Sequence, residues 1–312
     1  MMKKVILLLV IFLSSLVIFS GSALSQRDTA GKAGYVGSET CRGCHEAYYE
    51  SYARSVHGKK AVPGTPASSF GCESCHGPGA EHVQKGGGRG TGIFTFERGV
   101  AAEKKSAQCL SCHEDSRHLA FWNLSEHQSS GVSCDQCHSS HFGGDENLRG
   151  PEPDLCFDCH RSINFQVNKQ SHHPIREGKV MCTSCHDTHG TMNPKMIKAD
   201  TVNELCYKCH AEMRGPFMWE HPPVEENCLT CHTPHGSNHN RLLDKKLPQL
   251  CQSCHEWSGH PATAYTQADA FIKPPGVTVP ISNKLVGRSC LNCHTNIHGS
   301  NGPGTHGLRF VR

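Results

Sequence analysis

The chain has 312 residues, a formal net charge of +3, and a composition that includes 20 cysteines, 24 histidines and 31 glycines. Only 36% of its residues are hydrophobic and 7% are aromatic, which excludes an ordinary core built from side chains alone. A chain of this kind needs disulfides, metals or cofactors as a further source of buried surface.

The first 25 residues have the pattern of a secretion signal. Lys3 and Lys4 precede an apolar run over residues 5–19, and small residues at Ala23 and Ser25 fit a cleavage site. An uncleaved membrane anchor is the alternative, although the run is short beside the roughly 20 residues of a membrane span. We therefore expect an exported mature chain over residues 26–312.

Every cysteine after the signal belongs to a C-x-x-C-H unit, the pattern of covalent c-type haem attachment. The two thiols form thioethers with the haem, and the following histidine is the proximal iron ligand. The ten units are Cys41-Cys44-His45, Cys72-Cys75-His76, Cys109-Cys112-His113, Cys134-Cys137-His138, Cys156-Cys159-His160, Cys182-Cys185-His186, Cys206-Cys209-His210, Cys228-Cys231-His232, Cys251-Cys254-His255 and Cys290-Cys293-His294.

Zinc ribbons and disulfides are the competing interpretations of paired cysteines. Zinc has no need of a histidine directly after each second cysteine, and disulfides need none either. Ten such histidines by chance have a probability on the order of 10⁻¹¹. The sequence therefore predicts ten covalent haems c.

The motifs form five tandem pairs, which begin at residues 41/72, 109/134, 156/182, 206/228 and 251/290. Each pair has a histidine between its two motifs and another shortly after its second motif. The inter-motif histidines are His57, His127, His173, His221 and His260. The post-motif histidines are His82, His141, His189, His235 and His298. These ten are predicted to be the distal ligands, which closes every iron to substrate.

His189 raises a question of geometry, because it follows the proximal ligand His186 by three residues. So short a stretch cannot wrap around a porphyrin to the opposite face, so we expect His189 to bind a neighbouring haem. The glycines that follow such histidines, Gly190, Gly236 and Gly299, allow tight turns and close approach to a haem ring.

Four histidines remain as spares: His118, His172, His239 and His306. His118 competes with His127 as a ligand, His172 competes with His173, and His306 competes with His298. The proline after His173 favours that residue over His172. The methionines beyond the signal do not follow the repeat.

The predicted fold is a multihaem cytochrome c with mostly irregular loops and short α-helices around a linear haem chain, and with little or no β-sheet. About 29 residues per haem leave the cofactors themselves as the core. Residues 26–312 are expected to form a single elongated domain. Ser38 is expected to cap a helix that runs through residues 39–56. The glycine-rich segment 83–108 and the proline-rich segment 261–289 are expected to be surface loops or partner contacts.

The net charge gives no support for nucleic-acid binding. Loss of Lys3 and Lys4 with the signal reduces the formal charge from +3 to +1. The propionates of ten haems, partly offset by ten ferric haem cores, would then leave the oxidised protein at roughly −9.

Ten C-x-x-C-H units in tandem pairs behind a signal peptide resemble the periplasmic decahaem cytochromes of the MtrA/DmsE type. The stretches "GRSCLNCHTNIHGSN" (287–301), "CTSCHDTHG" and "CLTCHTPHG" carry the resemblance. It implies a place inside an outer-membrane β-barrel porin. The expected redox partners are a periplasmic or inner-membrane cytochrome donor and an outer-surface multihaem cytochrome or extracellular acceptor.

Other functions fit the same motifs. A soluble periplasmic shuttle, or an electron-donor subunit of a periplasmic reductase, would have the same ligands without a porin. A cytochrome filament has no dedicated sequence signal. A multihaem reductase needs one open iron, and no motif here ends in the lysine that some of them use. We therefore expect an electron carrier rather than an enzyme.

Overall fold

The computed structural model describes residues 33–142, 145–255 and 289–311. The chain divides into two compact units, one formed by residues up to 115 with 131–150, and the other by residues 116–130 with 151–312. The predicted signal peptide lies outside the described residues. A single domain over residues 26–312 stays a prediction.

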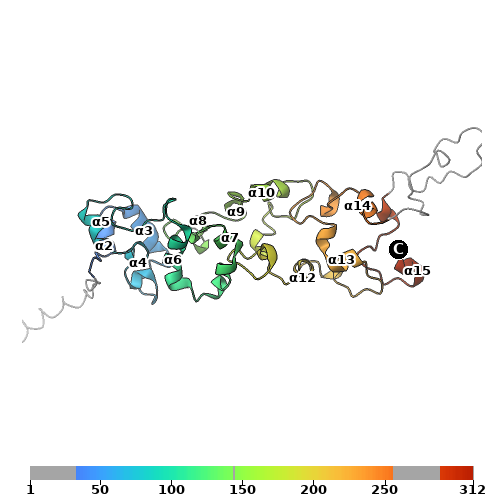
Figure 1. Ribbon diagram of the computed structural model, residues 1–312, viewed down its shortest axis with the longest axis horizontal. Coiled ribbons are helices and arrows are strands. Elements are labelled where there is room, and N and C mark those ends of the chain that lie inside the picture. Colours follow the sequence, from blue (N-terminus) through green and yellow to red (C-terminus); the bar gives the residue numbers. More distant parts are fainter. Residues whose placement is uncertain (1–32, 143–144, 256–288, 312) are drawn as a thin grey trace, which may run out of the picture. The chain divides into compact units, whose positions relative to one another are not determined.

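The first unit consists of short helices joined by irregular segments (Figure 1). Its α-helices are α2 (Ser38–Arg42), α3 (Glu46–Arg54), α4 (Glu73–His76), α5 (Ala80–Gln84), α6 (Ala102–His113) and α8 (Cys134–Cys137). Its 3₁₀ turns are η1 (Pro66–Ser68) and η4 (Asp145–Asn147).

The second unit is built in the same way (Figure 1). Its α-helices are α7 (Glu126–Ser129), α9 (Asp154–Phe157), α10 (Arg161–Val167), α11 (Cys182–Cys185), α12 (Val202–Tyr207), α13 (Pro222–Glu226), α14 (Gln249–Gln252) and α15 (Gly304–Leu308). Its 3₁₀ turns are η2 (Arg117–Leu119), η3 (Trp122–Leu124), η5 (Pro194–Met196), η6 (Ala211–Met213), η7 (Cys228–Thr230), η8 (Asn240–Leu242) and η10 (Cys290–Asn292).

The predicted fold class is confirmed. The described ranges contain isolated antiparallel bridges, such as Ser171 with Ser237 and Trp219 with Ser300, but no sheet. In the same ranges, no helix has the length and apolar character needed to cross a membrane.

The single helix expected over residues 39–56 is wrong in detail. The structure has two helices there, because the chain leaves helical geometry at His45, which has φ −120° and ψ 45°. Ser38 does not cap the first helix; its hydroxyl accepts a hydrogen bond from the Cys72 amide at 3.1 Å. The helix therefore breaks within the C-x-x-C-H motif, and His45 lies between α2 and α3 rather than inside one helix.

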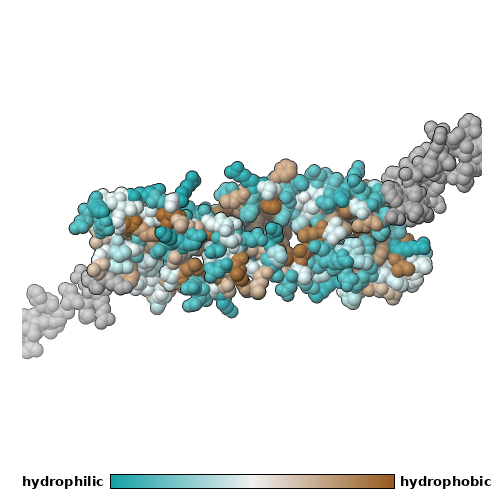
Figure 2. Space-filling view, in the orientation of Figure 1, coloured by the Kyte–Doolittle hydropathy of each residue, from teal (hydrophilic) through white to brown (hydrophobic). Residues whose placement is uncertain are grey.

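Side chains alone provide little core. Among the described residues, the buried apolar side chains are Trp122, Val167, Ile175 and Met196. Figure 2 shows small apolar spots separated by hydrophilic surface on the face in view. This agrees with the expectation that cofactors, rather than side chains, supply most of the buried apolar surface.

A buried carboxylate ties the start of the first unit to its second motif. Glu73 is only 3% exposed. Its carboxylate accepts hydrogen bonds from the amides of Val36 at 2.9 Å, Gly37 at 2.9 Å and Gly79 at 2.8 Å. Three backbone donors on one carboxylate satisfy its charge without a cation.

We expect Glu73→Ala to lower the stability of the holoprotein by about 3 kcal/mol, because three buried amides lose their acceptor. Thermal unfolding followed by circular dichroism measures the change. Glu81→Ala is the matched control, since the Glu81 carboxylate is exposed and forms a surface ion pair with Lys85 at 2.6 Å. Equal melting temperatures for the two variants would contradict the assigned role of Glu73.

Candidate haem-binding site

The first cysteines of the two motifs in each predicted pair lie against each other. Cys41 interacts with Cys72 and Cys109 with Cys134 in the first unit. In the second unit the interacting pairs are Cys156–Cys182, Cys206–Cys228 and Cys251–Cys290. Within each pair, the two attachment points are therefore brought together by the fold.

Each motif folds into a single tight turn that brings its cysteines and histidine together. The amide of the motif histidine donates to the carbonyl of the first cysteine, at 2.9 Å for His45 and 3.0 Å for His186. No cysteine in the described ranges forms a disulfide. Disulfide bonds therefore do not compete with thioether attachment at the described cysteines.

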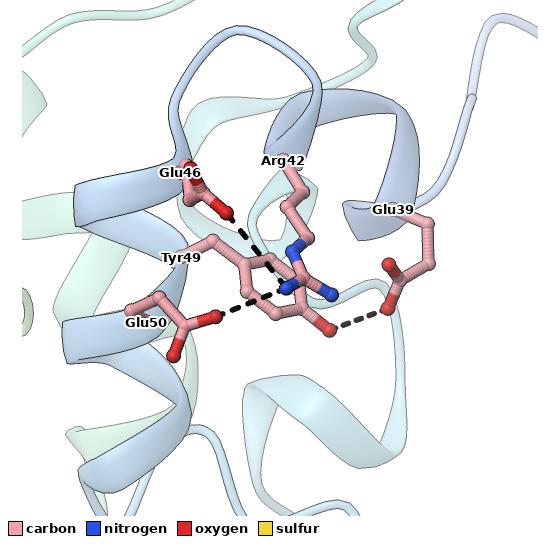
Figure 3. Close-up of polar contacts among 5 residues, drawn as sticks. All are labelled: Glu39, Arg42, Glu46, Tyr49 and Glu50. Carbon is pink, nitrogen blue, oxygen red and sulfur yellow. Dashed lines mark hydrogen bonds and ion pairs between the residues drawn. The ribbon is translucent and has the colours of Figure 1, made fainter.

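A polar cluster fixes the first motif (Figure 3). Arg42 pairs with Glu50 at 3.2 Å, and its guanidinium lies 5.1 Å from the centre of the Tyr49 ring. The Tyr49 hydroxyl donates to Glu39, and this hydrogen bond, with burial, raises the pKa of Tyr49. These contacts join α2 to α3 on either side of His45.

The central feature of the site is a repeated pairing of histidines. In the described ranges, eight motif histidines each face one predicted distal histidine. The ring centres are 6.3 Å apart for His45–His82, 5.9 Å for His76–His141, 6.0 Å for His57–His113 and 6.0 Å for His127–His160. They are 6.2 Å apart for His186–His235, 6.3 Å for His173–His210, 6.2 Å for His232–His298 and 6.1 Å for His221–His255.

These separations fit an iron held between two imidazoles. A metal–nitrogen bond of about 2 Å on each side, and about 1.1 Å from each nitrogen to its ring centre, place the two centres about 6 Å apart. Burial, followed by the charge of the facing histidine, lowers the pKa of His57, His141 and His235. A lowered pKa favours the neutral imidazole, which is the form that binds iron.

The pairing follows a simple order along the chain. An inter-motif histidine faces the first motif histidine of the next pair, as His173 faces His210. A post-motif histidine faces the second motif histidine of the preceding pair, as His235 faces His186. His82 differs, since it faces His45 of its own pair. Successive pairs in each unit are therefore interlocked.

Two predicted distal ligands are not among these eight. His260 lies outside the described residues. His189 lies against Trp122, with ring centres 6.5 Å apart. The ring that faces His186 belongs to His235 rather than to His189, which agrees with the geometric argument about its short loop.

The spare histidines are placed elsewhere. The two ring nitrogens of His172 contact the Lys169 carbonyl at 2.6 Å and Glu177 at 3.2 Å. The Glu177 hydrogen bond raises the pKa of His172. His118 and His306 are exposed, on η2 and α15. Their competitors His127, His173 and His298 are the residues that face motif histidines.

Backbone carbonyls orient the second histidine of each pair. The acceptors next to Nδ1 are Phe94 for His76, Glu146 for His138, Lys195 for His186, Arg241 for His232 and Arg309 for His294, at 2.6 to 3.1 Å. An imidazole that binds iron through Nε2 carries its proton on Nδ1 and donates it to such a carbonyl. The contact fixes the ring and increases its basicity.

Three of these carbonyls belong to residues in the left-handed backbone region. Glu146 has φ 54°, Lys195 φ 58° and Arg241 φ 60°, although none is glycine. Such geometry costs of order 1 kcal/mol and persists where the surroundings impose it. These residues could not be recognised from the sequence, because the acting group is a main-chain oxygen and the side chains show no common pattern.

The glycines after the post-motif histidines have a different role from the one expected. A Cβ on Gly190 would lie 2.4 Å from the Phe121 carbonyl oxygen, and one on Gly236 would lie 2.0 Å from that of Gln166. The close approach is therefore made to a neighbouring stretch of backbone. That stretch leads into an inter-motif histidine, so the glycine brings the two ligand loops together.

The glycine-rich loop after His82 also contributes to the site. Thr91 accepts a hydrogen bond from His82 Nδ1 at 3.0 Å, and Phe94 accepts from His76 at 2.9 Å. Part of the segment 83–108 thus supplies hydrogen-bond acceptors to one histidine in each of two histidine pairs. Most of the other loop, 261–289, lies outside the described residues.

Comparison with known proteins agrees with this geometry. Residues 127–165, 172–215 and 221–260 each match the family described as "Doubled CXXCH motif", and residues 95–139 match "Cytochrome c554 and c-prime". The chain is 38% identical over 285 residues to the multiheme cytochrome MtrA of Shewanella baltica, covering 90% of this chain and 84% of that protein. The chain belongs to the MtrA family of multihaem cytochromes. As a member of the MtrA family it binds haem c through its C-x-x-C-H motifs and transfers electrons.

More distant relatives are larger proteins. The C-type polyheme cytochrome OmcB of Geobacter sulfurreducens is 24% identical over 300 residues, which is 85% of this chain but 36% of OmcB. The dissimilatory sulfite reductase MccA of Wolinella succinogenes is 21% identical over 234 residues, which is 64% of this chain and 28% of MccA. Both matches show sequence similarity between this chain and proteins outside the MtrA family.

Proposed function

We propose that this MtrA-family chain carries electrons through ten covalent haems c, each held between two histidines. The electrons pass between periplasmic redox partners and the outer-membrane or extracellular side. The supporting observation is the set of eight histidine pairs with ring centres 5.9 to 6.3 Å apart. Bound haem supplies an iron that alternates between its ferric and ferrous states.

The chain's own residues would hold each iron closed. The motif histidine occupies one axial position, and a histidine from a neighbouring loop occupies the other. With both positions filled there is no site for substrate, so the chain passes electrons rather than transforming a bound molecule. Two imidazoles also avoid the thioether ligand that raises haem potentials, which favours low potentials.

We infer that the chain works in the periplasm inside an outer-membrane β-barrel porin. Its likeness over 90% of its length to a multiheme cytochrome MtrA supports this inference. The partners would be a periplasmic or inner-membrane cytochrome as donor and an outer-surface cytochrome or extracellular acceptor. The alternative is a soluble periplasmic shuttle or a reductase-partner subunit.

The test measures the haem content and the haem spin state of the purified protein, and then reconstitutes the protein with a porin in liposomes. We expect an intact mass with ten haems and a resting EPR spectrum of low-spin haem. We also expect co-purification with a co-expressed candidate outer-membrane porin, and reduction of a dye sealed inside liposomes that hold the pair. Liposomes with the porin alone are the control.

Each part of the proposal can fail separately. One stoichiometric high-spin haem would contradict complete closure and favour a reductase. Ten low-spin haems without porin binding or transmembrane reduction would favour the shuttle.

A further inference from the structure

The inter-motif histidines differ in whether the ring nitrogen Nδ1 has a hydrogen-bond acceptor. His127 Nδ1 lies 2.9 Å from the Thr188 carbonyl oxygen, and His173 Nδ1 lies 2.6 Å from that of Pro234. Each acceptor is the residue just before a post-motif histidine, His189 or His235. The same repeat would assign the Ser140 carbonyl, just before His141, to His57.

His57 does not have this hydrogen bond. Its Nδ1 is fully buried and has no acceptor among the described residues. Buried polar atoms are almost always hydrogen-bonded, so this nitrogen needs an explanation. His221 Nδ1 also has no acceptor at hydrogen-bond distance. Burial and the charge of His255 lower the pKa of His221, but the Ile297 backbone just before His298 partly offsets them. His57 is therefore the clearer exception.

The sequence next to His141 explains the exception. The residue after a post-motif histidine is Gly190, Gly236 or Gly299 in three other pairs, but it is Phe142 after His141. At Gly236 a Cβ would lie 2.0 Å from the Gln166 carbonyl oxygen, so a side chain cannot occupy that position. The Phe142 ring instead lies outward, 59% exposed and 4.9 Å from the Tyr48 ring. The Ser51 hydroxyl on α3 donates to the His141 carbonyl, so this loop does contact α3, but its Ser140 carbonyl makes no hydrogen bond to His57 Nδ1.

We propose that Phe142 withholds a hydrogen bond from His57 and thereby raises the reduction potential of the haem attached at Cys109 and Cys112. This rests on the proposed function, in which His57 and His113 are the ligands of that haem. A carbonyl at Nδ1 makes an imidazole more basic and stabilises ferric iron, so its absence stabilises ferrous iron. Electrons that enter the first unit would collect at this haem first.

The angle between the two imidazole planes should distinguish the same haem in an EPR spectrum. The planes of His57 and His113 are 75° apart, whereas those of His76 and His141 are 14° apart. The other pairs in the described ranges lie between 16° and 55°. Nearly perpendicular imidazoles leave two iron d orbitals close in energy, which gives a highly anisotropic low-spin EPR signal. Nearly parallel imidazoles separate those orbitals and give a rhombic signal.

The experiment is a potentiometric titration of the full-length holoprotein, followed by EPR. We expect the most anisotropic signal to disappear first on reduction, at a potential at least about 59 mV above the midpoint of the rhombic signals. This corresponds to a tenfold difference in the one-electron equilibrium constant. Loss of that signal together with or after the rhombic signals would overturn the proposal.

Two variants test the cause. Phe142→Gly introduces the residue found in three of the four other loops. It should lower the potential of the haem that gives the anisotropic signal, by at least the amount that corresponds to a threefold change in its one-electron equilibrium constant. Phe142→Leu keeps a side chain there and should leave that potential unchanged. Equal potentials in all three proteins would overturn the role of Phe142.

A third variant separates this inference from the ligand scheme. His57→Ala should produce one high-spin haem and remove the most anisotropic signal. A His57→Ala protein that stays wholly low-spin would refute ligation by His57, and with it both proposals. Correct ligation with an ordinary potential would refute only the tuning.

Discussion

Replacing His173 by alanine is expected to open one iron. The ring of His173 faces that of His210 at 6.3 Å, and its loss would leave the haem at Cys206 and Cys209 with one axial imidazole. We expect a high-spin ferric EPR signal of one spin per molecule, and binding of one equivalent of carbon monoxide after reduction. The potential of that haem should also change, since an axial ligand sets it.

His172→Ala is the matched control, because the two histidines are adjacent. His172 contacts Lys169 and Glu177 and faces no motif histidine in the described ranges. We expect this variant to keep a low-spin spectrum and to bind no carbon monoxide. If His172→Ala opened an iron and His173→Ala did not, the choice between these residues would have to be reversed.

Adding one methyl group at Gly236 should loosen the junction between two ligand loops. The new Cβ would lie 2.0 Å from a backbone oxygen, which cannot rotate away as a side chain could. The nearby bridge between Ser171 and Ser237, with hydrogen bonds of 3.0 and 2.7 Å, would be strained as well. Overpacking and weakened hydrogen bonds together suggest a loss of about 3 kcal/mol in the free energy of unfolding for Gly236→Ala.

Gly150→Ala is the control for the Gly236 variant. A Cβ at Gly150 would meet no atom within 4 Å, and its φ is not positive. We expect no loss of stability there, and a gain of up to about 1 kcal/mol from the stiffer unfolded chain. Denaturant titration of both holoproteins measures the difference, and equal midpoints would show that the loop junction tolerates a side chain.

The attachment motifs could be recognised from the sequence because c-type haem attachment needs a fixed local spacing. Cys182, Cys185 and His186 stand within five positions, so no tertiary structure is needed to recognise them. The fold class also followed from local features, since so few apolar side chains cannot form a layered core. Pattern counting could further favour His173 over His172 through the proline that follows.

Other features depend on contacts that sequence spacing does not encode. The partner of His173 is His210, 37 positions later, and nothing local selects it over other motif histidines. The orienting carbonyls of Glu146, Lys195 and Arg241 belong to residues with unrelated side chains. The prediction of a single helix over residues 39–56 was wrong because the sequence signals for a helix do not include the break at His45, within the haem motif.

The interlocked order of histidines constrains how the protein can be matured and shortened. His173 faces a motif histidine of the pair that follows, and His235 faces one of the pair that precedes. In the proposed ligand scheme, neither pair would therefore complete its iron coordination alone. A fragment cut between these pairs would retain its thioether bonds and yet lose one axial ligand on each side of the cut. During maturation, haem would thus have to be attached to both neighbouring motif pairs before either pair gains its final axial ligands.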